Sequence, residues 1–177
     1  MDGLILLSIG ERVANAIVEL LQGVPNWVIV VLIAMLPIVE LRAAIPVAIA
    51  VLHMHWAEAM AFAIIGNMIP IPFVLWLLDP LRRLLSRWTF FDRLFERIFN
   101  HALKRSKALQ NTETIGLILF VAIPLPATGA WTGSLAAYLL RFPRGKSLLY
   151  ILYGVLIASV VVTLATMGTI GAVRLIG

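Results

Sequence analysis

The stretch Pro37-Ile-Val-Glu40-Leu-Arg42-Ala-Ala-Ile-Pro46 interrupts a mostly apolar segment that runs from residue 25 to residue 52. A proline inside a helix removes a backbone hydrogen bond. An ionisable side chain inside a bilayer costs roughly 2.5–3.5 kcal/mol on insertion scales. A plain spanning helix therefore fits this segment poorly. We predict a re-entrant helical hairpin over 25–52, and a kinked full span is the alternative.

A second apolar segment, over 113–140, is interrupted in the same manner by Pro124, Pro126, Gly129 and Gly133. It predicts a second hairpin. Each arm has about 12 residues, and at 1.5 Å per residue it reaches about 18 Å. That length passes the middle of a bilayer but does not cross it.

Two further apolar segments, 56–78 and 147–173, are uninterrupted and long enough to span a bilayer. Of the 177 residues, 62% are hydrophobic and 13% are charged, and the mean hydropathy is +1.01. In soluble domains roughly 45–50% of the residues are hydrophobic and about 25% are charged. The composition therefore excludes a soluble enzyme and predicts an all-α integral membrane protein.

Positive charge sets the orientation of these segments. Eleven of the 14 lysine and arginine residues lie in 82–107 and 141–146. The positive-inside rule places both loops in the cytoplasm, so 113–140 begins and ends on the cytoplasmic side and 25–52 enters from the outer side. Hairpin followed by span then occurs twice in opposite orientation, which is an inverted repeat. The net charge of +5 thus indicates topology rather than nucleic-acid binding.

The whole chain, 1–177, is expected to form one membrane domain. Repeat 1 covers 25–78 and repeat 2 covers 113–173, and an offset of 87 residues superposes the first proline of one break on the first proline of the other. Amphipathic helices accompany the repeats. We expect 1–23 to lie at an interface, and we expect the basic amphipathic connector 80–108 to rest on anionic headgroups in the cytoplasm.

Glu40 and Arg42 are the strongest candidates for function. They lie near the predicted turn of the first hairpin, and a spacing of two places them on different faces of a helix, so each needs its own partner. Burial in an apolar pocket disfavours a carboxylate, which makes Glu40 a candidate proton carrier. Arg42 keeps its charge and suits a fixed phosphate contact. A structural ion pair or a helix cap is the alternative.

The second arm of each hairpin is expected to begin near the midplane, around Glu40 and Thr128, and a helix N-terminus attracts an anion. Small residues at the second break serve either this site or helix packing. Asn67, inside the first span, serves either an interhelical bond or the substrate path. The candidate substrate or proton pathway consists of Glu40, Arg42, Pro37, Pro46, Asn67, Pro124, Pro126, Thr128, Gly129 and Thr132.

Metal and cofactor chemistry has little support in the sequence. There is no cysteine, and His53, His55 and Glu58 offer no clear fourth ligand for a metal. No Walker motif, dinucleotide fingerprint, nucleophile elbow or zinc-protease motif is present. We therefore expect no cofactor, no metal, no enzymatic activity and no ATP-driven transport by this chain alone.

The two breaks, Pro37–Pro46 and Phe120–Gly133, resemble the small multidrug export protein family of prokaryotes, and the resemblance covers about residues 25–172. That family is distantly similar to the DedA (SNARE-associated, VTT-domain) superfamily, whose members have two opposed re-entrant hairpins. Several of them are implicated in moving lipids across bilayers. The first hairpin of that superfamily commonly has a proline, then a glutamate, then a further proline, as Pro37, Glu40 and Pro46 do here. Its second hairpin commonly has arginines around the prolines, and this sequence has none there. The resemblance implies a multi-pass protein of the prokaryotic inner (cytoplasmic) membrane.

Three functions follow as hypotheses. The first is a small secondary transporter for a lipid-like or amphipathic anionic substrate, coupled to protons through Glu40. The second is an exporter of cationic amphipathic drugs, with Glu40 as the partner of the cation. The third is a non-transporting membrane scaffold. Membrane lipids and the substrate are the expected partners, nucleic acid is not, and a homodimer would cover polar hairpin surface.

Overall fold

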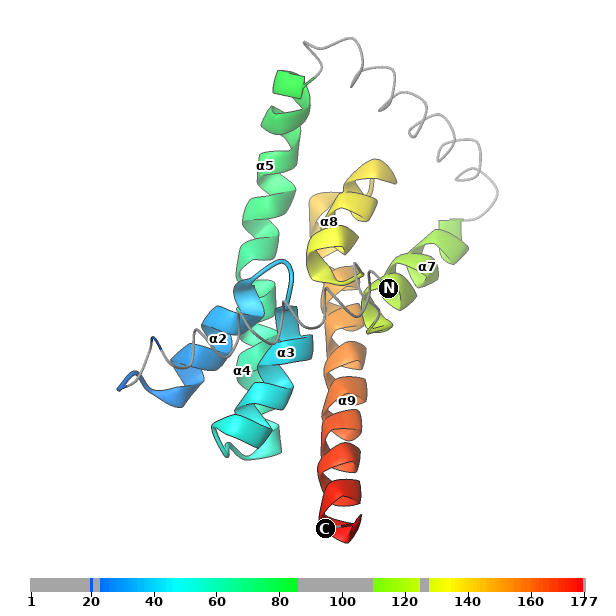
Figure 1. Ribbon diagram of the computed structural model, residues 1–177. Helices are drawn as coiled ribbons and strands as arrows, with labels where there is room; N and C mark the ends of the chain where they lie inside the picture. The colour runs from blue at the N-terminus through cyan, green and yellow to red at the C-terminus, as the bar shows by residue number, and fades with distance from the viewer. Residues whose placement is uncertain (1–19, 21–22, 86–109, 125–127, 177) are drawn as a thin grey trace.

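The part of the chain that the structure describes is helical almost throughout. The computed structural model describes residues 20, 23–85, 110–124 and 128–176, and no strand occurs among them. The elements, labelled as in Figure 1, are α2 (Asn26–Met35), α3 (Glu40–Pro46), the π-helix η1 (Val47–Val51), α4 (Trp56–Met68), α5 (Pro70–Leu85), α7 (Gln110–Ala122), α8 (Ala130–Leu139) and α9 (Arg144–Ile176).

Two long helical rods run through the molecule in opposite directions (Figure 1). One is α4 continued by α5, and the other is α9. Within them, Trp56–Leu78 and Arg144–Ala172 are long and apolar enough to cross a membrane. The prediction of a helical protein with two candidate membrane spans is confirmed for the described residues, although the first span is divided between α4 and α5 at Ile69.

The remaining helices form two hairpins whose turns are caused by prolines. α2 ends because Leu36 precedes Pro37, and the proline ring forces the preceding residue into an extended conformation (φ −74°, ψ 133°). α7 ends in the same way, one residue before the Ile123-Pro124 pair. In Figure 1 the α2–α3 hairpin opens toward the bottom and the α7–α8 hairpin opens toward the top, and their turns meet beside the middle of the rods.

The second arms of the two hairpins end alike. α3 contains Pro46, which cannot donate a backbone hydrogen bond, and the helix continues as the π-helix η1. The chain then leaves η1 through His53 (φ 52°), and it leaves α8 through Arg141 (φ 58°). A left-handed residue directly after a helix is a common way to end it.

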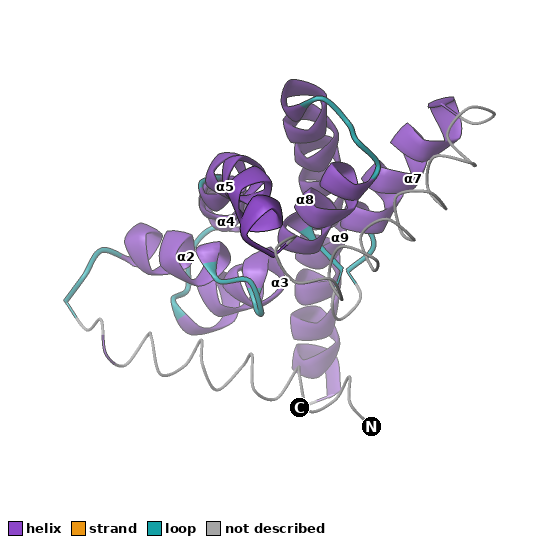
Figure 2. Ribbon diagram, turned by 90° about the horizontal axis from the view of Figure 1, so that it is seen from above, coloured by secondary structure: helices purple, strands orange, loops and turns teal. Residues whose placement is uncertain are grey.

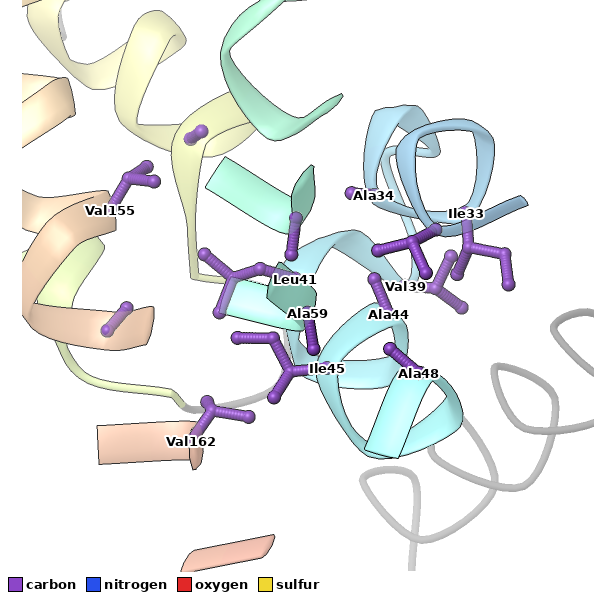
Figure 3. Packing of buried hydrophobic residues seen from close by; sticks show 14 of the residues in the cluster. Ile33, Ala34, Val39, Leu41, Ala44, Ile45, Ala48, Ala59, Val155 and Val162 are labelled. Atoms are coloured by element: carbon purple, nitrogen blue, oxygen red, sulfur yellow. The ribbon is translucent and has the colours of Figure 1, made fainter. Parts of the chain in front are cut away.

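The centre of the core is the buried face of α3, which contacts α2, α4 and α9. Leu41, Ala44 and Ile45 are almost fully buried, and Figure 3 shows them with Ala59 nearby and Val162 of α9 beyond Ile45. Seen from above, α2 and α7 lie on opposite sides of the molecule (Figure 2). Because lipid tails are as apolar as these side chains, packing contacts rather than release from water hold such a core together in a membrane.

Glycines let each rod approach the first arm of a hairpin closely. A Cβ atom at Gly66 of α4 would lie 2.8 Å from the Cα atom of Val31 in α2. A Cβ atom at Gly154 of α9 would lie 2.8 Å from Cγ1 of Val121 and 2.9 Å from the carbonyl oxygen of Ile118 in α7. Both helix pairs are therefore in backbone contact, as small-residue packing in membrane proteins allows.

The element boundaries differ from the expectation in places. α9 begins at Arg144 rather than at residue 147, and α5 continues through Pro80 to Leu85 rather than ending before the connector. A helix can continue through a proline by bending there, and α5 contains Pro80 in this way. The predicted interfacial helix lies almost wholly outside the described residues, and so does most of the predicted connector.

Candidate functional site

The turns of the two hairpins are joined by hydrogen bonds between residues 86 or 91 positions apart. Glu40, the first residue of α3, reaches the start of α8. Arg42, one half-turn further along α3, reaches the residue that precedes Gly129. The two ionisable side chains of the first hairpin thus both contact the second hairpin.

Glu40 is the buried charge at this junction, with only 4% of its surface exposed. Its Oε1 atom accepts a hydrogen bond from the backbone N–H of Trp131, at 3.3 Å. Trp131 belongs to the first turn of α8, where backbone N–H groups lack partners within the helix and carry a partial positive charge. The carboxylate therefore occupies the anion-binding end of α8.

The backbone at both turns is shaped for this contact. Glu40 has φ 50°, which is rare for a residue with a side chain, and Gly129, the N-cap of α8, has φ 139°. A Cβ atom at Gly129 would collide with the carboxylate of Glu40. Glycine is therefore required at 129 for its conformation and for the space that the carboxylate fills.

Arg42 holds the second turn from the other side. Its Nη2 atom donates to the carbonyl oxygen of Thr128 and, at 2.9 Å, to the hydroxyl oxygen of the same residue. That hydroxyl group donates in turn to the carbonyl oxygen of Ile123, at 2.9 Å. Arg42 is half-buried, so these charge-assisted bonds are stronger than exposed ones. They fix the position of the turn that carries Gly129.

Asn67 of α4 lies beside the carboxylate of Glu40 and is completely buried. Within the described part of the chain, neither its Oδ1 nor its Nδ2 atom has a hydrogen-bond partner of acceptable geometry. The indole N–H of Trp131 is likewise buried and unpaired among the described residues. Such orphaned groups are rare in folded proteins.

The structure brings five of the predicted pathway residues into one cluster: Glu40, Arg42, Asn67, Thr128 and Gly129. Thr132 lies next to it, and its hydroxyl group points back to the carbonyl oxygen of Gly129, at 3.4 Å. This bond closes the first turn of α8. The cluster stays a predicted substrate or proton pathway.

The predicted prolines are peripheral to this cluster. Pro37 and Pro124 are exposed on the two turns, Pro46 is half-buried within α3, and Pro126 lies outside the described residues. Their contribution is to break the helices, and the polar side chains make the contacts.

Trp131 is the site residue that the sequence did not single out. Its backbone N–H meets Glu40 because α8 begins at Ala130, two residues after the expected position. The signal lay in the Thr-Gly pair before it, since glycine commonly precedes a helix start.

His53, His55 and Glu58, considered above as metal ligands, have a structural explanation in part. The Nδ1 atom of His55 accepts from the backbone N–H of Ala57, at 3.3 Å, and so caps α4. Across the described residues, no group of three histidine, cysteine, aspartate or glutamate side chains is placed to hold a metal ion.

Comparison with known proteins gives one match. A family model described as "Putative small multi-drug export protein" matches residues 40–161. The match begins at Glu40, directly after the first turn, and includes the second turn. Neither the search of curated proteins nor that of solved structures returned a match.

Proposed function

This chain belongs to the small multi-drug export protein family, whose model covers more than half of its length, and from that premise we propose a specific mode of transport. The family description names an export protein, which suggests a membrane exporter. We propose that the chain is a small secondary exporter of a lipid-like or amphipathic anion. The substrate would pass the junction of two re-entrant hairpins that enter the membrane from opposite sides.

The direction of the two hairpins supports this proposal. Their turns meet beside the middle of the two candidate spans (Figure 1). Irregular backbone is tolerated at membrane depth only where protein or water satisfies it, and here the second turn receives the side chains of Glu40 and Arg42 from the first hairpin. Many secondary transporters place their substrate at such a meeting of broken helices.

An inverted repeat is part of the same proposal. His53 and Arg141, which end the two second arms, are 88 positions apart (141 − 53). Gly66 and Gly154, each of which packs a rod against a first arm, are also 88 positions apart (154 − 66). This register is close to the offset of 87 seen in the sequence. The distant relationship to the DedA superfamily, the multi-pass location in a prokaryotic inner membrane and the homodimer belong to this proposal as well.

The observation that carries the choice of an anion is the position of Glu40. Its carboxylate already accepts a hydrogen bond from the N-terminus of α8, so it is poorly placed to bind a cation. Arg42 and the N-terminal end of α8 contribute positive charge to the junction. Protonation of Glu40 would weaken its bond to α8, which gives a route for coupling to a proton gradient.

Export of a cationic amphipathic drug is the second candidate, because the family description names drug export. In that case Glu40 would have to leave α8 and pair with the cation. A competition experiment between an anionic and a cationic amphiphile therefore separates the two functions.

The test is flux through proteoliposomes that contain the full chain. We expect efflux of dodecyl phosphate, stimulated by an imposed pH gradient, and we expect Glu40→Gln and Arg42→Ala each to reduce the rate about tenfold or more, since each removes a charge-assisted contact. Thr163→Val is the matched control, because Thr163 bonds only within α9 among the described residues, to the carbonyl oxygen of Ser159.

Undiminished dodecyl phosphate flux in both site variants would remove Glu40 and Arg42 from the pathway. Preferential efflux of dodecyltrimethylammonium, lost in Glu40→Gln, would replace the anion exporter by the drug exporter.

A further inference from the structure

The buried amide of Asn67 lies beside the carboxylate of Glu40 but makes no hydrogen bond of acceptable geometry among the described residues. A buried amide without partners costs free energy that an apolar side chain of similar size would not. Gly66 and Gly154 are 88 positions apart and each packs a rod against a first arm. The same offset pairs Asn67 with Val155, which is also completely buried. A branched apolar side chain thus fits the equivalent place in the second half of the chain. Burial at this place therefore does not by itself require an amide.

Asn67 lies beside the carboxylate of Glu40, and Trp131 donates its backbone N–H to the same carboxylate. The unpaired groups of these two residues describe the ligand that would satisfy them. Nδ2 of Asn67 and Nε1 of Trp131 are donors without partners, and Oδ1 of Asn67 is the acceptor without a partner, among the described residues. The first turn of α8 adds backbone donors. Donors outnumber acceptors, which suits a group with several oxygens and a negative charge.

We propose that Asn67 and the indole N–H of Trp131 bind the oxyanion headgroup of an amphipathic ligand, and that this headgroup displaces the carboxylate of Glu40 from the N-terminus of α8. Glu40 is then an internal occupant of the ligand site, present in the empty state and expelled in the loaded one. This inference rests on the proposed function for its amphipathic substrate, and it deepens that function by naming the headgroup class and the exchange.

Exchange follows from the geometry of the junction. The backbone N–H of Trp131 donates to Oε1 of Glu40, and the absence of a side chain at Gly129 leaves space that the carboxylate fills. A second anion cannot take the same place while the carboxylate stays, because two negative charges would then share one helix end. Removal of the Glu40 charge therefore favours binding of the ligand, although it impairs transport.

The experiment measures binding to the purified full chain in dodecyl maltoside, by isothermal titration calorimetry. The probes are dodecyl phosphate, dodecanoate, inorganic phosphate and dodecyltrimethylammonium. We expect both anionic amphiphiles to bind more tightly than the cation. Inorganic phosphate, which lacks the chain, separates a free anion from an amphiphile as the source of the headgroup.

Three variants test the assignment of the residues. Glu40→Gln is expected to tighten dodecyl phosphate binding by about 3-fold or more, and Asn67→Val to weaken it by about 5-fold or more, since one hydrogen bond to a charged ligand is worth at least that factor. Trp131→Phe keeps a ring and removes the N–H, and it is expected to weaken binding as well. Thr163→Val is the control and is expected to leave the affinity unchanged.

Equal or weaker anion binding in Glu40→Gln would overturn the exchange, and unchanged affinity in Asn67→Val would overturn the role of the amide. The thermal unfolding midpoint of each variant without ligand shows that it is folded, and for Asn67→Val we expect this midpoint to rise because the orphaned amide is gone. Binding as described without flux would refute the proposed export and leave this site standing. Flux of the anion together with weaker binding in Glu40→Gln would refute the exchange at this site and leave the proposed export standing.

Discussion

At the scale of single residues, Glu40 and Gly129 depend on each other. Glu40 adopts a left-handed backbone conformation that costs a residue with a side chain of order 1–3 kcal/mol. The conformation is maintained because the carboxylate finds the N-terminus of α8, and it finds that end because Gly129 has no side chain. Strain of this kind persists where the surrounding structure over-determines it, and such places are often functional.

This dependence predicts the effect of Gly129→Ala. The added Cβ atom would collide with the Glu40 carboxylate, and alanine is strained at φ 139°, so we expect a loss of at least about 2 kcal/mol in unfolding free energy. Gly145→Ala is the matched control, because a Cβ atom there meets nothing within 4 Å. It should be neutral or stabilising by up to about 1 kcal/mol.

Chemical unfolding in mixed micelles, followed by circular dichroism, measures both variants. Equal stability of Gly129→Ala and the unaltered chain would show that the turn accommodates a side chain by moving away from Glu40.

At the scale of elements, the molecule is two hairpins packed on two rods. Each rod contacts the first arm of its own hairpin through a glycine, and α3, the second arm of the first hairpin, also contacts α9 of the other half. Buried hydroxyl groups along α9, such as those of Thr163 and Thr166, bond back to carbonyl groups one turn earlier. They need no partner from another helix, so α9 can pack by shape alone.

The glycine contacts give a prediction for helix packing. Gly66→Ala and Gly154→Ala would each place a methyl group within 3 Å of a neighbouring backbone or Val121 side chain, so we expect each to lower the unfolding free energy by about 1–3 kcal/mol. Gly116→Ala and Gly168→Ala, with open space at the Cβ position, serve as controls in helices of the same kind.

Thermal unfolding midpoints in one detergent provide the comparison. Should all four substitutions shift the midpoint alike, glycine would be acting through helix propensity rather than through close approach.

At the scale of the whole molecule, opposed hairpins require opposite sides of the membrane. The first hairpin opens beside the start of α4, and the second opens beside the start of α9 (Figure 1). If both are re-entrant, the loop around residue 53 faces outward and the loop around residue 144 faces the cytoplasm. The basic residues Arg141, Arg144 and Lys146 agree with the cytoplasmic assignment.

Single cysteines test this topology directly, because the chain has none of its own. In intact cells an impermeant maleimide should label His53→Cys, whereas Arg144→Cys should react only after permeabilisation. Thr163→Cys, at a buried position of α9, should resist the reagent in both conditions. Labelling of positions 53 and 144 from one side would refute the inverted arrangement.

Much of the helix pattern could be predicted from the sequence, because its causes are local. A run of apolar residues without charge forms a long helix wherever it lies, and the span 147–173 is such a run. A proline has no backbone N–H and restricts the backbone conformation of the residue before it. The helix breaks at Pro37 and Pro124 therefore follow from the residues alone. The presence of Glu40 and Arg42 at such a break marked them as candidates for the same local reason.

Only the tertiary structure decided which groups these side chains meet. Glu40 and Trp131 are 91 positions apart, and no periodicity or spacing specifies which helix end receives a carboxylate from the other hairpin. Asn67 reads as one more polar residue in a span, and its place beside Glu40, without a hydrogen bond of acceptable geometry among the described residues, follows from how α4 packs beside α3. Helices are set by interactions within a few residues, whereas a binding site is set by the docking of helices, which depends on the shapes of all of them together.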